Sequence, residues 1–560
     1  MRSSSNFVTL ALALMSGVSA AEYNSFDGPG FPTCYDVTAV HNATSVDESE
    51  FEVMMSDDVW PSLGGIRSCH SRHLETFQEE ADKRFHKWYP SSRLLRPQGD
   101  RFAQEARVTW YDTQCADLPT EIIRTELVNQ ISDFDLPAGA ESGTVVVEAG
   151  VTFFQLADYL HARGANIGTG LVNWNISLGG SVAMGAHRTS LREDAVVVGG
   201  VLSMDIIDGT GTIRTIERDE SNDEWLAAST SLGLLGIIAR LKMKIYPETV
   251  LYAMQKTFDE EDVLNGDIEA LISPYLTANL WQLLPTKELK GCTRPYKKKF
   301  HQRYYDVVGP GDVNQNGLQS TFSLTGIEAA AAISLLNTGK ALATSNMLAE
   351  EIFFGIWENP NFHTKDTNEE LTTWPVTGYN YDVLIGGLYP DQKAEWDFNL
   401  RGYTLELAFP VPLANKMLKR VRELFDAQWE EKLIVMTSTY RSGINIKFGK
   451  PHYDLLGQVT TNTSDGADWS KGAIMFDFPS FRPNIGDHLR FNEPFYHNLS
   501  ETLIKEFPCR PHWTKNTREV LTQSVKNLDP DHIARFKAVR EDFDPKGVFR
   551  SVVGEIIGVY

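Results

Sequence analysis

The sequence lacks the signatures of several large enzyme classes. No G-x-G-x-x-G motif follows a predicted strand, which argues against a Rossmann site for a nicotinamide cofactor. There is also no P-loop, no H-E-x-x-H zinc motif and no G-x-S-x-G nucleophile elbow. The chemistry of this chain must therefore depend on a different arrangement of residues.

Positive charge and long apolar runs are both scarce. The 560 residues include 52 Lys and Arg against 74 Asp and Glu, a formal net charge of −22. Such an excess of acidic groups argues against nucleic acid and anionic membranes as partners. After residue 20 no stretch reaches the ~18 apolar residues of a membrane-spanning helix. The partner that this composition leaves open is a small-molecule substrate.

Cysteine is scarce as well. Five are present, and the odd count requires at least one that is free or paired outside the chain: Cys34, Cys69, Cys115, Cys292 and Cys509. One segment, residues 69–73 (C-H-S-R-H), has three potential metal ligands. No second cluster completes a tetrahedral set, so the sequence predicts no metal site.

The first twenty residues have the features of a secretory signal peptide. Arg2 provides a positive charge, residues 7–18 are apolar, and Val18-Ser19-Ala20 fits a small-residue cleavage site. The sequence therefore predicts secretion, with N-glycosylation at the sequons of Asn42, Asn462 and Asn498. A further sequon, at Asn175, lies in a stretch that we expect to be buried and unmodified.

The length predicts two or three domains. We expect a loop-rich segment at residues 21–84, a first domain at 85–248, a second at 249–507 and a C-terminal segment at 508–560. In the first domain, periodicity predicts strands at 145–148, 195–208, 212–217 and 237–247, with helices at 154–163 and 223–228. Later elements are helices at 325–344, 413–429 and 533–543 and strands at 405–410 and 443–448. Strands and helices mix without βαβ repeats, which indicates an α+β class.

The stretch N-W-N-I-S-L-G-G-S-V-A-M-G-A-H-R-T-S, residues 173–190, has unusually little side chain. Backbone without side chains lets N–H groups approach a flat or charged ligand. The same composition also suits a tight turn where two strands cross closely. The residues alone do not decide between these interpretations.

The order of neighbouring motifs favours the ligand. With the strand ending at Glu148, the 208–217 hairpin and the segment S-L-G-L-L-G-I-I at 231–238, this region resembles the FAD-binding domain of the vanillyl-alcohol-oxidase superfamily, also called PCMH-type. The resemblance implies a PCMH-type domain of two α+β subdomains, an α+β substrate (cap) domain, and FAD. The cofactor-binding residues that it implies are Ser177, Gly179, Gly180, Ser181, Ala183, Gly185, His187, Gly236 and Ile237.

The C-terminus narrows the resemblance. The segments R-P-H-W-T-K-N at 510–516 and D-P-K-G-V-F at 544–549 are similar to the aldonolactone oxidase branch, which oxidises sugar lactones and alditols. That resemblance implies Lys515, His512 and Lys447 as catalytic residues. A lysine near the flavin would stabilise negative charge that develops at N1–C2=O, and His512 would orient the substrate or accept its hydroxyl proton. Each also has an ordinary interpretation: solvated lysines, and for His187 a buried histidine bracing its loop.

Three departures from that branch are visible. Residues 96–101 (R-P-Q-G-D-R) stand where many members carry a histidine linked to FAD, with Asp100 in its place, so the sequence predicts non-covalent FAD. Arg188 follows His187 where the branch has glycine. Asn445 and Lys447 replace a Glu-x-Arg pair, which changes how a polyol would be held.

These features together predict a secreted FAD-dependent oxidase that acts on an alcohol group of a sugar-lactone-like or polyol-like substrate, with dioxygen as oxidant. Two alternatives stay open. One is a flavin oxidase of a secondary metabolite or aromatic alcohol. The other is a secreted glycoprotein with this fold and no turnover.

Overall fold

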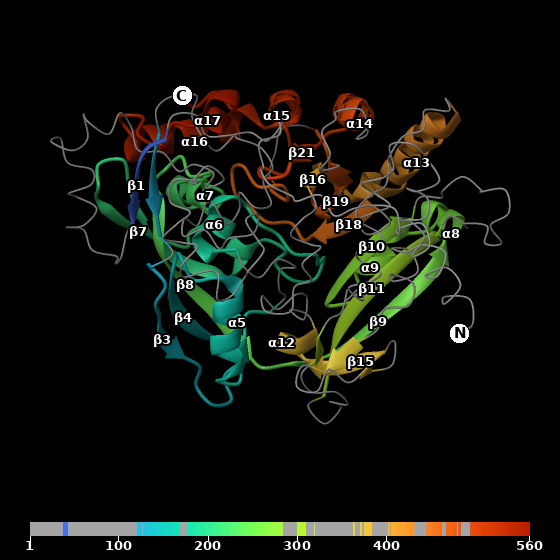
Figure 1. Ribbon diagram of the computed structural model, residues 1–560, viewed down its shortest axis with the longest axis horizontal. Coiled ribbons are helices and arrows are strands. Elements are labelled where there is room, and N and C mark those ends of the chain that lie inside the picture. The colour runs from blue at the N-terminus through green and yellow to red at the C-terminus, as the bar shows by residue number, and fades with distance from the viewer. Residues whose placement is uncertain are drawn as a thin grey trace, which may run out of the picture.

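A computed structural model describes residues 37–42, 120–125, 127–168, 176–283, 299–309, 318–319, 362–364, 370–371, 375–383, 401–403, 405–430, 444–461, 466–478, 480–482 and 493–560. Several predicted features lie outside these residues: the expected signal peptide, the C-H-S-R-H segment, the 96–101 segment with Asp100, the helix expected at 325–344 and the sequons of Asn175 and Asn462. Two antiparallel sheets, lying side by side, organise most of the described chain (Figure 1).

The first sheet has the strand order β3-β4-β8-β6-β7, and a short strand, β5, also pairs with β8. These strands are β3 (Ile131–Asp135), β4 (Gly143–Glu148), β5 (Ala165–Asn166), β6 (Val201–Ile207), β7 (Ile213–Glu217) and β8 (Ile237–Pro247). Helices α5 (Phe153–His161), α6 (Leu178–Ala183) and α7 (Asp223–Ala228) complete this part. Alternation along β8 and the 3.6-residue period of α5 place their apolar side chains in one shared core.

The second sheet has the strand order β15-β9-β11-β10-β18-β19-β17-β21. Its strands are β9 (Val250–Asp259), β10 (Thr277–Leu283), β11 (Lys299–Val308), β15 (Val376–Tyr379), β17 (Glu406–Pro410), β18 (Ile444–Gly449), β19 (Ala473–Asp477) and β21 (Arg510–Pro511). Helices α13 (Ala414–Glu430) and α14 (Glu493–Glu506) share one core with alternate residues of β17, β18 and β19. The remaining residues of those strands face the other way, toward the first sheet.

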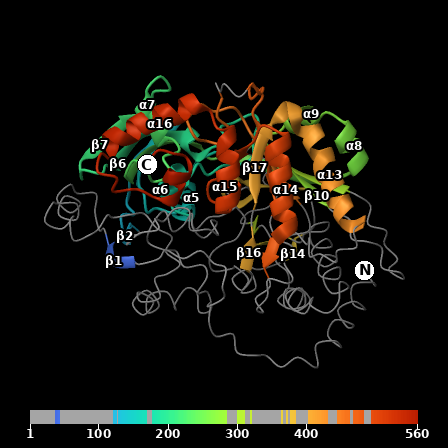
Figure 2. The same ribbon diagram turned by 90° about the horizontal axis from the view of Figure 1, so that it is seen from above.

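The C-terminal helices bridge both sheets. Helices α15 (Arg518–Ser524), α16 (Pro530–Phe543) and α17 (Val552–Ile556) run from α14 across the top of the molecule to α7 (Figures 1 and 2). Ion pairs fasten α16 to the first sheet's domain, with Arg535 2.6 Å from Asp223 and Arg214 contacting Asp542. The last 50 residues are therefore part of the same packed unit as residues 131–247.

Smaller elements complete the described chain. Parallel strands β1 (Val37–Asn42) and β2 (Thr120–Arg124) pair, as do β16 (Arg401–Tyr403) and β20 (Ser480–Arg482), and β12 (Leu318–Gln319), β13 (Phe362–Thr364) and β14 (Glu370–Leu371) form a three-stranded sheet. Short helices are α8 (Glu260–Asn265), α9 (Ile268–Ile272) and α12 (Asn380–Val383), with 3₁₀ turns at Val197–Gly200, Val411–Leu413 and Val525–Asn527. In the part of the chain described, no helix is long and apolar enough to cross a membrane.

The α+β class is confirmed, and two local predictions are wrong. The strand expected at 195–208 begins only at Val201, because residues 197–200 form a 3₁₀ turn. The 173–190 stretch, expected as a loop, contains α6 at residues 178–183. Every residue of α6 is buried, so the helix has no polar face and no amphipathic signal for periodicity to detect.

Among the other expected features, Asn498 is exposed on α14, and Cys509 is an unpaired, buried thiol. Burial raises the pKa of Cys509 to about 12. The other four cysteines lie outside the described residues.

Packing explains one glycine of α6 directly. A Cβ at Gly179 would lie 2.6 Å from Cβ of Ala149, which follows β4 in the core. We expect Gly179→Ala to lower the free energy of unfolding by about 1–3 kcal/mol, because overpacking forces the helix away from the sheet. Chemical denaturation measures this.

Gly200→Ala is the matched control, since a Cβ there meets nothing within 4 Å. Its expected change is within about 0.5 kcal/mol. Equal effects of the two substitutions would contradict the packing account of Gly179.

Candidate active site

The loop after α6 crosses from the first sheet's domain to the second sheet. Ser190 forms a parallel bridge with Gly449, accepting from Lys450 N (2.8 Å) and donating to Phe448 O (2.8 Å). Thr189 Oγ1 donates to Ala278 O at 2.5 Å. These bonds fix His187, which lies two residues before Thr189, at the boundary between the two sheets.

The two segments predicted to bind FAD lie together. Leu232 N donates to Ala183 O at 2.8 Å, and a Cβ on Gly185 would meet Thr230, so residues 230–236 pack on α6. The first four N–H groups of α6 all have protein acceptors: Leu178 with Val151, Gly179 with Ala149, and Gly180 and Ser181 with Ser177. Close packing thus accounts for these small residues, and their contact with FAD stays a prediction.

Each residue of the H-W-T-K-N segment has a defined position. The side chain of Asn516 accepts from Glu406 N (3.1 Å) and donates to Glu406 O (2.8 Å), which pins the segment to β17. Trp513 is buried and donates from Nε1 to Leu456 O at 2.8 Å. These anchors direct His512 and Lys515 toward the face of the second sheet that meets the first.

Strand register creates a polar row on that face. Asp477 of β19 pairs with Glu406 of β17 on one side and with Asn445 of β18 on the other. Directly paired residues project to the same side of a sheet, so these three side chains share the face. Lys447, two residues beyond Asn445, projects there too.

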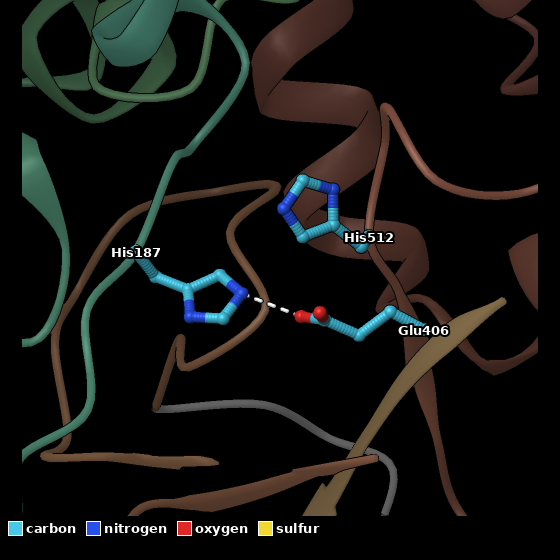
Figure 3. A group of neighbouring side chains, drawn as sticks. All are labelled: His187, Glu406 and His512. Atoms are coloured by element: carbon cyan, nitrogen blue, oxygen red, sulfur yellow. Dashed lines mark hydrogen bonds and ion pairs between the residues drawn. The ribbon is translucent and has the colours of Figure 1, made fainter. Parts of the chain in front are cut away.

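Glu406 is the centre of this row. Its side chain is completely buried, with Oε2 accepting from Lys515 Nζ (2.7 Å) and Lys447 Nζ (3.0 Å). Its Oε1 lies 2.5 Å from His187 Nε2, a contact drawn as a dashed line in Figure 3. Both lysines also contact Asp477 Oδ2, at 3.0 and 3.2 Å. Neither lysine is the solvated surface residue that the sequence left open.

Hydrogen-bond geometry assigns a proton to each nitrogen of His187. Nδ1 lies 3.0 Å from the carbonyl oxygen of Arg188, which can only accept, so Nδ1 donates. The short Nε2 contact with Glu406 also requires a proton, on either the ring or the carboxyl. Burial would raise the pKa of Glu406, but the charges of Lys447 and Lys515 hold it well below its usual range. The proton therefore belongs to His187, which is an imidazolium.

His512 is in the opposite state. Its Nδ1 accepts from the backbone N–H of Thr514 at 3.1 Å, so a proton on Nδ1 would face another proton. Burial, together with the charge of Lys515, holds the pKa of His512 well below its usual range despite the attraction of Glu406. The ring is neutral, with its single proton on Nε2. In this state His512 presents a donor, which favours orientation of a substrate over acceptance of its proton.

The cluster carries surplus positive charge. Burial opposes the ammonium of Lys515, but Asp477 and Glu406 raise its pKa above the usual value, so it stays charged. Three cations, His187, Lys447 and Lys515, then face two carboxylates. A buried site with one uncompensated positive charge stabilises negative charge that develops beside it.

His187, Glu406 and His512 also have the residue types of a metal site, with ligand atoms within 4.8 Å of one another (Figure 3). Two contacts argue against this use. Two ammonium groups already occupy Glu406. A metal on Nε2 of His512 would need the proton on Nδ1, where Thr514 donates.

Sequence reasoning named His187, Lys447, His512 and Lys515, and the structure brings these four together. It did not select Glu406 or Asp477 as site residues. Arg188, the departure beside His187, is buried, and desolvation lowers its pKa to about 10. Its Nη1 donates to Ile167 O at 3.2 Å.

Known proteins match both halves of this site. A family model for an FAD binding domain matches residues 114–217, and one for D-arabinono-1,4-lactone oxidase matches residues 481–555. L-gulonolactone oxidase 3 of Arabidopsis thaliana is 24% identical over 461 residues, 77% of this chain and 72% of that protein. L-gulonolactone oxidase 5 of the same plant is 23% identical over 457 residues, 75% and 70% of the two chains.

This chain is an FAD-linked oxidoreductase that is similar to the aldonolactone oxidases. A solved structure of cholesterol oxidase from B. sterolicum superposes with a TM-score of 0.59 at 13% identity, covering 80% of this chain and 88% of that one. At that identity the likeness concerns the fold alone, and it confirms the PCMH-type α+β architecture.

The donor set of the cluster fits the redox end of FAD. His187 lies next to the domain that carries the FAD-binding match and contributes to the surplus positive charge, together with Lys447 and Lys515. These are the groups that would hold the isoalloxazine ring while negative charge grows on it. The structure therefore agrees with the cofactor that the comparisons indicate.

Glu406→Gln tests the centre of the cluster. The amide keeps the shape but removes the charge that three cations share, so we expect the free energy of unfolding to fall by about 3–5 kcal/mol. Thermal and chemical denaturation measure the change. Glu423→Gln, at an exposed pair with Arg420 on α13, should change it by less than about 1 kcal/mol. Equal losses of unfolding free energy in the two variants would show that Glu406 is not central to the stability of the cluster.

The two shifted pKa values predict acid sensitivity in two stages. His512 stays neutral in the folded protein because its pKa is lowered well below the ordinary histidine value of 6.5. Below pH 6.5 the unfolded chain therefore binds a proton at His512 that the folded chain does not bind. Stability then declines by up to about 1.4 kcal/mol per pH unit from this group. Glu406, whose pKa is depressed, adds a second loss below its ordinary value of 4.5.

Unfolding free energies measured from pH 8 to pH 4 check this. His512→Asn retains an acceptor for Thr514 but cannot titrate, so its curve should be flatter than that of the unaltered protein between pH 6.5 and 5. Parallel curves would show that His512 is not held neutral.

Proposed function

We propose that this protein oxidises an alcohol group of a sugar-lactone-like or polyol-like substrate and passes the electrons to dioxygen. The observation that carries the proposal is the buried cluster around Glu406, where three cations face two carboxylates at the boundary of the two sheets. When bound, FAD supplies the acceptor, at N5, for the hydride of the alcohol carbon.

The side chains of the cluster bind and orient. His187, Lys447 and Lys515 place positive charge where electron density increases during the reaction, in surroundings from which burial excludes water. His512 offers an N–H donor to a substrate oxygen. No group needs to move to make these interactions, so the stabilisation is available when the reaction begins.

The names of the relatives support the substrate class. The matched family model and the Arabidopsis proteins are named for sugar lactones. Asn445 and Lys447 replace a Glu-x-Arg pair, and an ammonium cannot form the paired hydrogen bonds of a guanidinium. This difference favours a second candidate, an alcohol of different shape such as a secondary metabolite or aromatic alcohol.

We also propose that the protein is secreted and glycosylated and that its FAD is dissociable. The apolar segment near residue 10, the sequons and the residues at 96–101 support these proposals. Secretion in turn supports dioxygen as the oxidant, because a secreted protein has no respiratory cytochrome beside it. The remaining candidate, a glycoprotein without turnover, predicts no flavin reduction.

Purified mature protein tests these proposals in sequence. A yellow protein that releases its colour into the supernatant after acid precipitation has dissociable FAD, whereas a yellow pellet contradicts that proposal. Anaerobic bleaching of the flavin and aerobic peroxide release across sugar lactones, alditols and aromatic alcohols then identify the substrate class. A colourless protein, or a flavin that no alcohol bleaches, refutes the proposed function.

Lys515→Met tests the role of positive charge. We expect flavin reduction by the substrate to slow by about 10²–10³-fold, the usual effect of removing one group that stabilises developing charge. Stopped-flow absorbance measures it. Lys471→Met, at an exposed pair with Glu269, is the control and should leave the rate unchanged. An unaltered rate in Lys515→Met would remove this lysine from the mechanism.

A further inference from the structure

Two oxygens in the polar row have no partner within the described residues. Asp477 Oδ1 and Asn445 Oδ1 are both buried and accept no hydrogen bond. Both residues are over nine-tenths buried, with exposed fractions of 7% for Asp477 and 8% for Asn445. A buried acceptor without a donor costs about 1–3 kcal/mol, so an unpaired couple indicates a ligand that supplies donors.

The two oxygens come from side chains that are neighbours on the same face of the sheet. Asp477 and Asn445 are direct cross-strand partners on β19 and β18, and paired side chains on one face have Cβ atoms about 5 Å apart. Two acceptors on neighbouring side chains can each accept from one of two adjacent hydroxyl groups of a sugar or alditol. The pair therefore suits a ligand with two neighbouring O–H donors.

The other proton acceptors of the cluster are already in use. Glu406 accepts from His187 through Oε1 and from both lysines through Oε2. His512 Nδ1 accepts from Thr514. Asp477 Oδ2 accepts from both lysines, which leaves Oδ1 as the carboxylate oxygen of the cluster that is open to a donor.

We propose that Asp477 is the catalytic proton acceptor, whose Oδ1 binds the hydroxyl being oxidised, and that the Asn445 amide oxygen binds the neighbouring hydroxyl. The inference rests on the proposed function and deepens it. It assigns the base to β19, on a residue that sequence reasoning did not select, in place of His512.

In the proposed step the substrate hydroxyl donates to Asp477 Oδ1, and bound FAD would supply the hydride acceptor. The C–H hydrogen would leave the carbon with its electron pair, the O–H proton would pass to Asp477, and the O–H electron pair would become the second bond of the new carbonyl. Lys447 and Lys515 bind Oδ2, which leaves Oδ1 for the substrate hydroxyl.

The charged groups that face Asp477 come from three elements: Lys447 on β18, Glu406 on β17 and Lys515 after β21. A carboxylate at this position can take up the proton of the substrate hydroxyl, whereas an amide cannot.

Asp477→Asn is the decisive variant. We expect it to bind FAD with an unchanged visible spectrum and to be reduced by the alcohol 10²- to 10⁴-fold more slowly, the usual contribution of a general base. Asn445→Ala should instead raise the substrate concentration for half-maximal reduction and leave the limiting rate within a few fold.

Asp468→Asn is the matched control, an exposed aspartate on the segment before β19. It should behave as the unaltered protein. If Asp477→Asn fails to fold, Asp477→Glu provides a second test, since a carboxylate displaced by one methylene should slow flavin reduction and leave FAD binding unchanged.

The outcomes separate the two proposals. A flavin that no alcohol of the panel reduces in the unaltered protein refutes the proposed function and this inference with it. Normal substrate oxidation that is unaffected in Asp477→Asn refutes only the inference. Weakened FAD binding with a normal rate at saturating FAD would also overturn it, because Asp477 would then contact the cofactor.

Discussion

The buried carboxylate of Glu406 is the interaction on which the arrangement of this site depends. It receives His187 from the first sheet's domain, Lys447 from the second sheet and Lys515 from the C-terminal segment. Without this charge, three cations would be desolvated beside one remaining carboxylate, Asp477. One side chain thus binds together three parts of the chain, at residues 187, 447 and 515, and it does so where cofactor and substrate are proposed to meet.

Charge and proton positions in the cluster follow from ordinary backbone contacts. The carbonyl of Arg188 sets the proton on one nitrogen of His187, and the N–H of Thr514 removes it from one nitrogen of His512. Two histidines with ring centres 5.2 Å apart therefore have opposite states: one is a fixed cation and the other a neutral donor. Because His187 is charged and His512 is not, the site has a net positive charge although both of its lysines are paired with carboxylates.

The sequence predicted much of the fold from periodicity alone. The helix at Asp223–Ala228 and the strand at Ile237–Pro247 have the expected bounds, because their apolar residues recur with the period of their own structure. Residues 197–200 were misjudged because a run of valines and glycines does not distinguish a strand from a 3₁₀ turn. For His512 and Lys515 the signal was the H-W-T-K-N motif. Glu406 and Asp477 had no comparable signal, since their meaning comes from strand register, which pairs positions 71 residues apart.

The attachment of the H-W-T-K-N segment to β17 has a consequence for the order of events during synthesis. Residues 131–247, which hold most of the first sheet and its core, leave the ribosome long before Asn516 does. Until that point Glu406 lacks Lys515 and the side-chain amide of Asn516, which hydrogen-bonds to its backbone N–H and carbonyl. Helices α15 and α16, which cover the sheets, have not yet been made either. The cluster is therefore completed only once residues 510–516 have been made, later than the other strands of both sheets.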